Sequence, residues 1–202
     1  LERAPIIGVD SLDGTGLDDL RGALDEMLRA TPDAVDRRRP RLWIDRAFSA
    51  KGSGTVVTGT LTGGRVRVDD ELILHPAGRV VRVRALQSLH APRTKVGPGN
   101  RTAVNLSGVG HDEVGRGDVL VRADDWHLTR VFDGSLSVLD SLDHEVSRRG
   151  AHLLYLGAGE HPVRIRILGP EFVESVQNIA QISAVLTGTA ASSASGVGAV
   201  FI

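Results

Sequence analysis

The sequence contains no cysteine among its 202 residues. This absence excludes a disulfide framework, a thiolate metal site and a cysteine nucleophile, and it is typical of proteins from a reducing compartment. No apolar run approaches the roughly 18 residues that a membrane-spanning helix needs, and no signal peptide is recognisable. We therefore expect a cytoplasmic protein that does not contact a membrane.

An excess of one charge is also lacking. The 24 Lys and Arg residues oppose 25 Asp and Glu residues, so the formal net charge is −1. A surface that binds nucleic acid must then be a local patch of cations and not a property of the whole chain. Hydrophobic residues make up 41% of the chain, which is enough for one domain or for two small ones.

Catalytic and metal-binding patterns are absent as well. Gly54–Thr60 has the glycine spacing of a phosphate-binding loop, but Thr60 stands where the lysine belongs and the segment is rich in β-formers. No G-x-S-x-G elbow occurs, and the seven histidines follow no zinc-ligand spacing. A stand-alone β-barrel enzyme would need convergent acid-base or metal-binding residues. We therefore predict no catalytic residue and no metal site.

The first thirty residues predict one strand and one helix. Pro5–Val9 is a short apolar run of the buried-strand kind, and Thr15–Asp18 has the spacing of a capping box before an amphipathic pattern. Such a pair cannot bury itself, so it either docks on a later part of the chain or ends a larger α/β domain. Residues 31–40 then predict an exposed linker, whose Arg37–Arg39 run is either a solvated hinge or a phosphate contact.

Short β-rich segments separated by glycines begin at residue 41. They predict a closed barrel or a sandwich over residues 41–124, with a hairpin turn at Gly63-Gly64. A second set, at 129–138, 151–156 and 161–168, predicts another barrel over 125–202. The uncharged residues 175–202 have three open interpretations: strands of that barrel, a foreign tail, or a join across a gap. The predicted fold class is mainly β, with two small β-barrels after a strand-helix segment.

Four ordered motifs identify a family. They are Ile44–Leu61 with Gly63–Val66, Val80–Leu86, Gly97–Val109 and Val114–Leu120. In this order they resemble domain 2 of translational GTPases of the elongation factor Tu class. Within that class, the segment IDRAFSAKGSGTVVTGTL resembles the selenocysteine-specific elongation factors. The resemblance implies that residues 1–30 end a GTP-binding domain, that 31–40 link it to domain 2, and that 125–202 are a domain 3. The closing Gly-Asp-Arg motif of domain 3 is not found in 175–202, so we expect that domain to be incomplete.

The resemblance also implies a function. Members of this branch deliver selenocysteinyl-tRNA to the ribosome for selenocysteine incorporation, and their domain 2 binds the aminoacyl end of the tRNA without catalysing a reaction. By motif alignment, the residues expected to read the selenocysteinyl group are Asp45, Arg46 and Arg101. Strand alternation puts Asp45 and Arg46 on opposite faces unless a bulge intervenes. Further expected contacts are the tRNA backbone at Arg37, Arg38, Arg39 and Lys51, and the guanine-base loop at Ser11 and Leu12.

The resemblance also implies which activities of the parent protein this chain lacks. It lacks a phosphate-binding loop, switch regions and an Asn-Lys-x-Asp motif, so we expect no GTP binding, no cofactor and no enzymatic activity here. GTP and magnesium would belong to the parent protein, and the messenger RNA element would be bound only through C-terminal domains absent from this chain. We expect a monomer. The alternative is that these are the equivalent domains of another elongation factor Tu-like GTPase.

Overall fold

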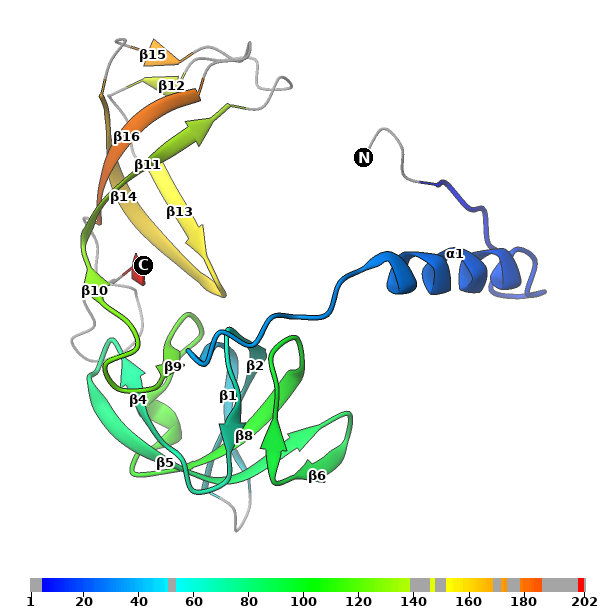
Figure 1. Ribbon diagram of the computed structural model, residues 1–202, viewed down its shortest axis with the longest axis horizontal. Coiled ribbons are helices and arrows are strands. Elements are labelled where there is room, and N and C mark those ends of the chain that lie inside the picture. The colour runs from blue at the N-terminus through cyan, green and yellow to red at the C-terminus, as the bar shows by residue number, and fades with distance from the viewer. Residues whose placement is uncertain are drawn as a thin grey trace. The chain divides into compact units, whose positions relative to one another are not determined.

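The computed structural model describes residues 5–50, 54–138, 146–147, 152–168, 172–173, 179–186 and 200–201. The chain divides into two compact units between Ala34 and Val35. The first unit contains α1 (Leu17–Ala30), drawn in blue in Figure 1. None of its residues is buried, and Leu24, Met27 and Leu28 are exposed. No helix in the described ranges is long and apolar enough to cross a membrane.

Two local predictions for this unit are wrong. The helix begins after Gly16, which adopts a left-handed conformation and has no side chain to cap the helix, so the capping box expected at Thr15–Asp18 does not form. Residues 5–10 are not a strand, because no described strand lies beside them to complete a hydrogen-bonded ladder. The apolar run at Pro5–Val9 is therefore an irregular segment before the helix.

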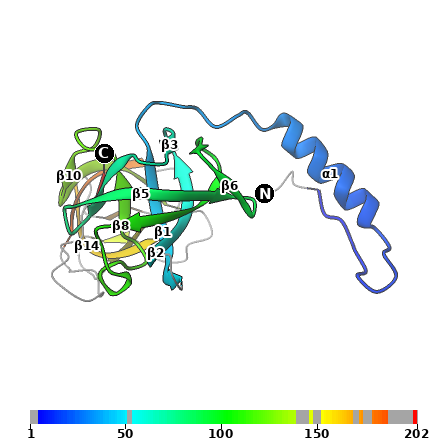
Figure 2. The ribbon, with the colours of Figure 1, turned by 90° about the horizontal axis from the view of Figure 1, so that it is seen from below.

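The second unit begins with a closed antiparallel barrel. Its strands follow the order β4-β9-β1-β2-β8-β5, and pairing of β4 with β5 closes the ring, while β6 extends the β5 edge. In Figure 2, β5 and β8 run side by side and β6 lies at the end of β5. The elements are β1 (Arg41–Ala50), β2 (Gly54–Thr62), β3 (Val66–Arg67), β4 (Glu71–His75), β5 (Arg79–Ser88), β6 (Ala91–Arg93), β7 (Lys95–Val96), β8 (Arg101–Ser107), the 3-10 helix η1 (His111–Glu113) and β9 (Val119–Val121).

Alternating side chains of these strands fill the barrel. Ile44, Val57 and Val83 are fully buried and belong to one apolar cluster that strands β1, β2 and β5 share with their neighbours. The residues between them point outward, because successive side chains of a strand lie on opposite faces. The outer face of β1, β2 and β8 is therefore the surface that can carry polar groups.

The Gly63-Gly64 turn does not make the predicted hairpin. Strand β2 pairs with β1 and β8, whereas β3 pairs with β7 in a separate ribbon. The Gly63 carbonyl instead accepts hydrogen bonds from the backbone N–H groups of Arg37 and Arg39, at 2.9 and 3.0 Å. A Cβ atom at Gly64 would lie 2.5 Å from the nitrogen of Pro40. The glycines thus allow residues 36–40 to pack against the barrel.

A second antiparallel sheet follows the barrel in sequence, with the order β11-β16-β14-β13. Within the described residues this region is a half-barrel sheet with two short ribbons, which agrees with the mainly β fold class predicted from the sequence. Its core contains Val163, Ile167, Ile182 and Leu186. The elements are β10 (Leu128–Thr129), β11 (Val131–Ser137), β12 (Val146–Ser147), β13 (His152–Leu156), β14 (Gly159–Ile167), β15 (Phe172–Val173), β16 (Ile179–Leu186) and β17 (Val200–Phe201).

Strand β16 resolves part of the ambiguity over residues 175–202. It pairs with β11 on one side and with β14 on the other, so it lies inside the sheet. Of the three interpretations, the described part of this stretch therefore fits strands of the second β region. Most of the other residues between 175 and 202 lie outside the described ranges.

Candidate functional site

A β-bulge in β1 places two adjacent charged residues on the same side of the strand. Ile44 pairs with Gly59 and Arg46 pairs with Thr58, which leaves Asp45 as an extra residue without a partner on β2. Ile44 points into the core, whereas Asp45 is partly exposed and Arg46 is exposed. Regular alternation would have separated Asp45 from Arg46, and the bulge is the exception that lets both face outward.

Asp45 is held by two neighbouring strands. Arg101, at the start of β8, donates from Nη2 to Oδ1 of Asp45 at 3.0 Å and from Nη1 to Oδ2, which makes a two-pronged ion pair. Thr58 of β2 donates from Oγ1 to the same Oδ1 at 2.7 Å. The structure therefore joins Asp45 and Arg101, which are 56 positions apart in the sequence.

The contacts between Asp45 and Arg101 favour the charged form of both side chains. The hydrogen bond from Arg101 lowers the pKa of Asp45 below its ordinary value, and the hydrogen bond from Thr58 and the charge of Arg46 act in the same direction. The hydrogen bond to Asp45 raises the pKa of Arg101. Asp45 and Arg101 are thus both ionised at neutral pH, and Arg46 adds one further positive charge. Arg46 makes no ion pair with a residue in the described ranges.

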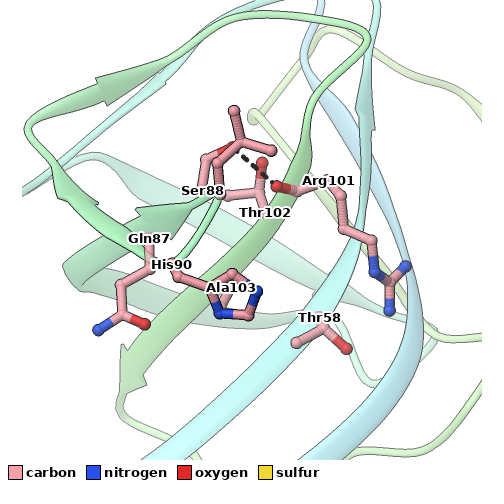
Figure 3. Close-up of a pocket in the computed structure, with 8 residues that line it drawn as sticks. Thr58, Gln87, Ser88, His90, Arg101, Thr102 and Ala103 are labelled. Carbon is pink, nitrogen blue, oxygen red and sulfur yellow. Dashed lines mark hydrogen bonds between the residues drawn. The ribbon is translucent and has the colours of Figure 1, made fainter.

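A pocket of about 290 Å³ opens beside Arg101. Its walls come from β2, from the start of β8 and from the end of β5 with the turn after it (Figure 3). The buried Ser88 hydroxyl donates to the backbone carbonyl of Arg101 at 2.9 Å, which fixes the arginine backbone at the rim. The lining residues are Thr58, Gln87, Ser88, Leu89, His90, Arg101, Thr102 and Ala103.

The pocket and the ion pair share two residues. Arg101 and Thr58 both line the pocket, and both hold Asp45, so a ligand in the pocket would lie next to the ionised pair. Asp45 and Arg46 do not line the pocket themselves. Figure 3 shows the Arg101 side chain extending away from Ser88 toward the strand that carries Thr58. A guanidinium has more N–H donors than the two used here, so Arg101 retains donors for a ligand.

Sequence reasoning did not find the pocket residues Thr58, Gln87 and His90. Thr58 pairs with Ala103 and Ala103 pairs with Gln87, so one outward row crosses three strands. Only the strand register reveals such a row, and residue spacing does not determine the register. Leu89 and His90 have positive φ angles of 53° and 59°, which carry the chain from β5 into β6 and present His90 to the pocket.

The arginines predicted on the entry segment, Arg37, Arg38 and Arg39, do not line this pocket. The side chain of Arg39 donates from Nε to the Asp125 carbonyl at 2.7 Å and stacks on Trp126, and Arg37 and Arg38 are exposed on the same segment. Lys51 lies outside the described residues. The structure therefore does not bring Arg37, Arg38 or Arg39 to the pocket that Arg101 lines.

Ser11 and Leu12 lie in an exposed turn of the first unit. The Leu12 N–H donates to Asp10 Oδ1 at 2.8 Å, and the Thr15 N–H donates to Asp13 Oδ1 at 2.8 Å and so lowers the pKa of Asp13. These hydrogen bonds are internal to the turn.

Residues 54–121, which span the barrel from β2 to β9, match the profile of the family described as elongation factor Tu domain 2. The barrel is thus similar to elongation factor Tu domain 2. The chain is 36% identical over 177 residues to the selenocysteine-specific elongation factor of Desulfomicrobium baculatum, which covers 86% of the chain and 27% of that protein. It is 40% identical over 112 residues to the selenocysteine-specific elongation factor of Escherichia coli, which covers 54% of the chain and 18% of that protein.

Two solved structures share the fold of this chain. The translation elongation factor SelB from Methanococcus maripaludis superposes with a TM-score of 0.80 at 22% identity, over 92% of this chain and 44% of that one. A bacterial selenocysteine-specific elongation factor, EF-Sec, superposes with a TM-score of 0.74 at 22% identity, over 88% of this chain and 28% of that one. The chain thus spans about a quarter of the length of the first curated relative that it matches.

Proposed function

We propose that this chain is part of a translational GTPase that delivers selenocysteinyl-tRNA to the ribosome, and that its barrel binds the aminoacyl end of the tRNA. The observation that carries the proposal is the contact between Asp45 and Arg101 at the rim of a pocket. In this arrangement Arg101 and Arg46 recognise the selenocysteinyl side chain, and Asp45 holds the Arg101 guanidinium in place. The barrel binds and does not catalyse.

The chemistry of the ligand supports this assignment. A selenol is more acidic than a thiol, whose reference pKa is about 8.5, so it is an anion at neutral pH, whereas a seryl hydroxyl is not. Asp45 and Arg101 cancel in charge, and Arg46 leaves the site with a net positive charge. A hydrogen bond to a charged group contributes about 1.5–3 kcal/mol, which is about one to two orders of magnitude in affinity. That difference favours the selenocysteinyl group over the seryl group.

The size of the pocket also supports binding of a small terminal group. Its volume of about 290 Å³ is at the lower end of the range for small-molecule sites, roughly 300 Å³ and above. Apolar Leu89 and Ala103 border it together with the polar Gln87 and His90. The wall therefore offers both packing and hydrogen bonds to the part of the ligand next to the selenol.

The test is an NMR chemical-shift titration of the chain with a selenocysteinyl ester under reducing conditions, with the seryl ester as control. We expect selective shifts at Asp45, Arg46 and Arg101 with the selenol alone. Arg101→Gln should abolish them, whereas Arg82→Gln, which removes an exposed arginine paired with Asp69, should not. Equal shifts with both esters would contradict selenol recognition.

A second candidate function is that of another elongation factor Tu-like GTPase. It is favoured by the similarity to elongation factor 1-alpha of Metallosphaera sedula, which is 37% identical over 101 residues, 50% of the chain and 23% of that protein. In that case the same pocket takes an aminoacyl end without preference for an anion. Binding of both esters with equal affinity would support this candidate and rule out the first.

A further inference from the structure

The turn between β13 and β14 packs closely against the barrel. A Cβ atom at Gly117, in the turn before β9, would lie 2.9 Å from the Cα atom of Gly159. A Cβ atom at Gly157 would collide with the Trp43 ring. Arg116 Nε donates to a backbone carbonyl of the same turn at 3.1 Å. We call this contact the junction: Trp43, Arg116 and Gly117 of the barrel with Gly157, Ala158 and Gly159 of the turn.

His161 lies in β14 next to this turn. Its Nε2 atom would be 2.7 Å from a Cβ atom at Gly159, so the ring occupies space that a larger residue at that position would fill. Only 5% of His161 is exposed, and neither Nδ1 nor Nε2 has a hydrogen-bond partner among the described residues. An imidazole carries one N–H when it is neutral and two when it is protonated. Protonation would therefore add a charge and a second unpaired donor to a buried site.

The second sheet surrounds His161 with apolar groups. His161 pairs with Leu154 of β13, and Leu154 and Val163 belong to an apolar cluster on the same face. His152 pairs with Val163 and so shares this face, but it is a second base and not a counter-ion. Glu160, the adjacent carboxylate, lies on the opposite face of the strand. Strand β16, which pairs with β14, has no charged residue.

The barrel contributes two charged residues beside the junction. Arg116 is a cation, which offers no compensation for an imidazolium. Asp118 is buried, and its Oδ2 accepts from the Gly115 N–H at 2.8 Å. Neither side chain forms a hydrogen bond with His161. Burial raises the pKa of Asp118 and lowers the pKa of His161, so both groups favour their neutral forms.

We propose that His161 is a pH switch, and that protonation of its imidazole opens the junction between the barrel and the second sheet. The neutral ring fits the closed junction, whereas the imidazolium needs water or an acceptor. Opening breaks the Arg116 hydrogen bond and the packing of Trp43 against the turn. The barrel and the sheet each stay folded, because their buried residues form separate apolar clusters. The proposal does not depend on aminoacyl binding.

The direction of the switch follows from the pKa of His161. Because the closed junction lowers this pKa, closing is fully favoured above the ordinary value of about 6.5 and is weakened as the pH falls from there toward the lowered value. Within that window each pH unit shifts the equilibrium toward the open form by up to about tenfold. Asp118 acts in the opposite direction, because acid favours the buried form of a carboxyl group whose pKa is raised. Asp118 is therefore not the cause of opening in acid.

The experiment follows the amide signals of the three junction glycines by NMR, in the whole isotope-labelled chain, from pH 8 to pH 5. The paired test variants are His161→Met and His161→Lys, whose side chains are similar in length and differ in charge. The control is His111→Met, which replaces an exposed histidine in η1 outside the junction. The buried methyl groups of Val57 in the barrel and Ile182 in the sheet report whether both regions remain folded.

We expect the glycine signals of the parent chain and of His111→Met to move together as the pH falls, with a midpoint below about 6.5. His161→Met should keep the signals of the closed junction down to pH 5, because its side chain does not titrate. His161→Lys should show the signals of the open junction already at pH 8. The methyl signals of Val57 and Ile182 should keep their folded positions throughout, because only the junction opens.

Four results would overturn the proposal. The first is constant glycine signals in the parent chain from pH 8 to pH 5. The second is a transition that persists in His161→Met, which would assign it to another titrating group. The third is the same junction signals in His161→Met and His161→Lys at pH 8, since the charge would then have no effect. The fourth is loss of the folded Val57 and Ile182 methyl signals together with the glycine shifts, which would identify acid unfolding in place of a local opening.

Discussion

At the scale of single residues, Asp45 is the group whose charge state can be tested. Its pKa is lowered in the folded chain, chiefly by the hydrogen bond from Arg101, so its contribution to stability is present above the pKa of the unfolded state, about 3.9, and is lost as the pH falls through the lower folded-state value. We predict that Asp45→Asn lowers the free energy of unfolding by about 1 kcal/mol at pH 7. Urea unfolding of both proteins between pH 7 and pH 3 measures the difference, which should shrink below about pH 4.

The control for this prediction is Asp69→Asn. Asp69 also pairs with an arginine, Arg82, but both side chains are more than half exposed, so we expect a change near zero at every pH. If Asp45→Asn were equally destabilising at pH 7 and pH 3, the ion pair would not be the cause of its effect.

For the candidate site, the sequence predicts the identity of residues but not their contacts. The motif alone selected Asp45, Arg46 and Arg101, because residue identity is what a motif records. It did not predict that Arg101 donates two hydrogen bonds to Asp45. That contact depends on the bulge at Asp45 and on the position of β2 between β1 and β8. No local pattern in the sequence indicates either feature.

At the scale of elements, the Gly63-Gly64 turn provides a steric test. We predict that Gly64→Ala lowers the free energy of unfolding by about 1–3 kcal/mol, because its Cβ would meet Pro40 and the Arg39 carbonyl carbon at 2.5–2.9 Å. Gly97→Ala is the matched control: neither glycine has a positive φ angle, and nothing lies within 4 Å of a Cβ at Gly97. Urea unfolding of the two variants measures the contrast, and equal stabilities would mean that residues 36–40 do not pack as described.

Elements were predictable where they are long and alternate regularly. The β-rich segments predicted from residue 41 onward include β2, β4 and β8, along which buried and less buried positions alternate. Strands β6 and β7 were missed, since two or three residues cannot show a period. The false hairpin at Gly63-Gly64 has a different cause: the glycines are there for close approach of another segment, and a turn signal does not distinguish the two uses.

At the scale of the whole molecule, the chain divides into a first unit that ends at Ala34 and a second unit that contains the barrel. The closed barrel was predictable in outline from the series of short strands, while its strand order, which pairs β1 with β9 and β4 with β5, was not, because long-range pairing depends on packing between distant segments. The pairing of β16, an uncharged segment, with β11 and β14 was not predictable from the sequence for the same reason.

This division yields a prediction about truncation. A chain that begins at Val35 should unfold at the same temperature as the full chain, because the unit boundary falls there and α1 buries none of its residues. A chain that begins at Pro40 keeps all of β1 but loses two backbone hydrogen bonds to Gly63, the pair between Asp36 and Arg65, and the stacking of Arg39 on Trp126. These contacts together contribute about 2–3 kcal/mol, so its midpoint should fall by roughly 4–12 °C.

Thermal unfolding of the three chains, followed by circular dichroism in the same buffer, makes this measurement. The decisive comparison is between the two truncated chains, which differ by only five residues and share every strand of the barrel. If they unfolded together, residues 35–39 would be a linker without structural effect, as the arginine run first suggested. A fall in the midpoint confined to the Pro40 chain would instead show that the contacts of residues 36–39 make this segment an integral part of the barrel unit.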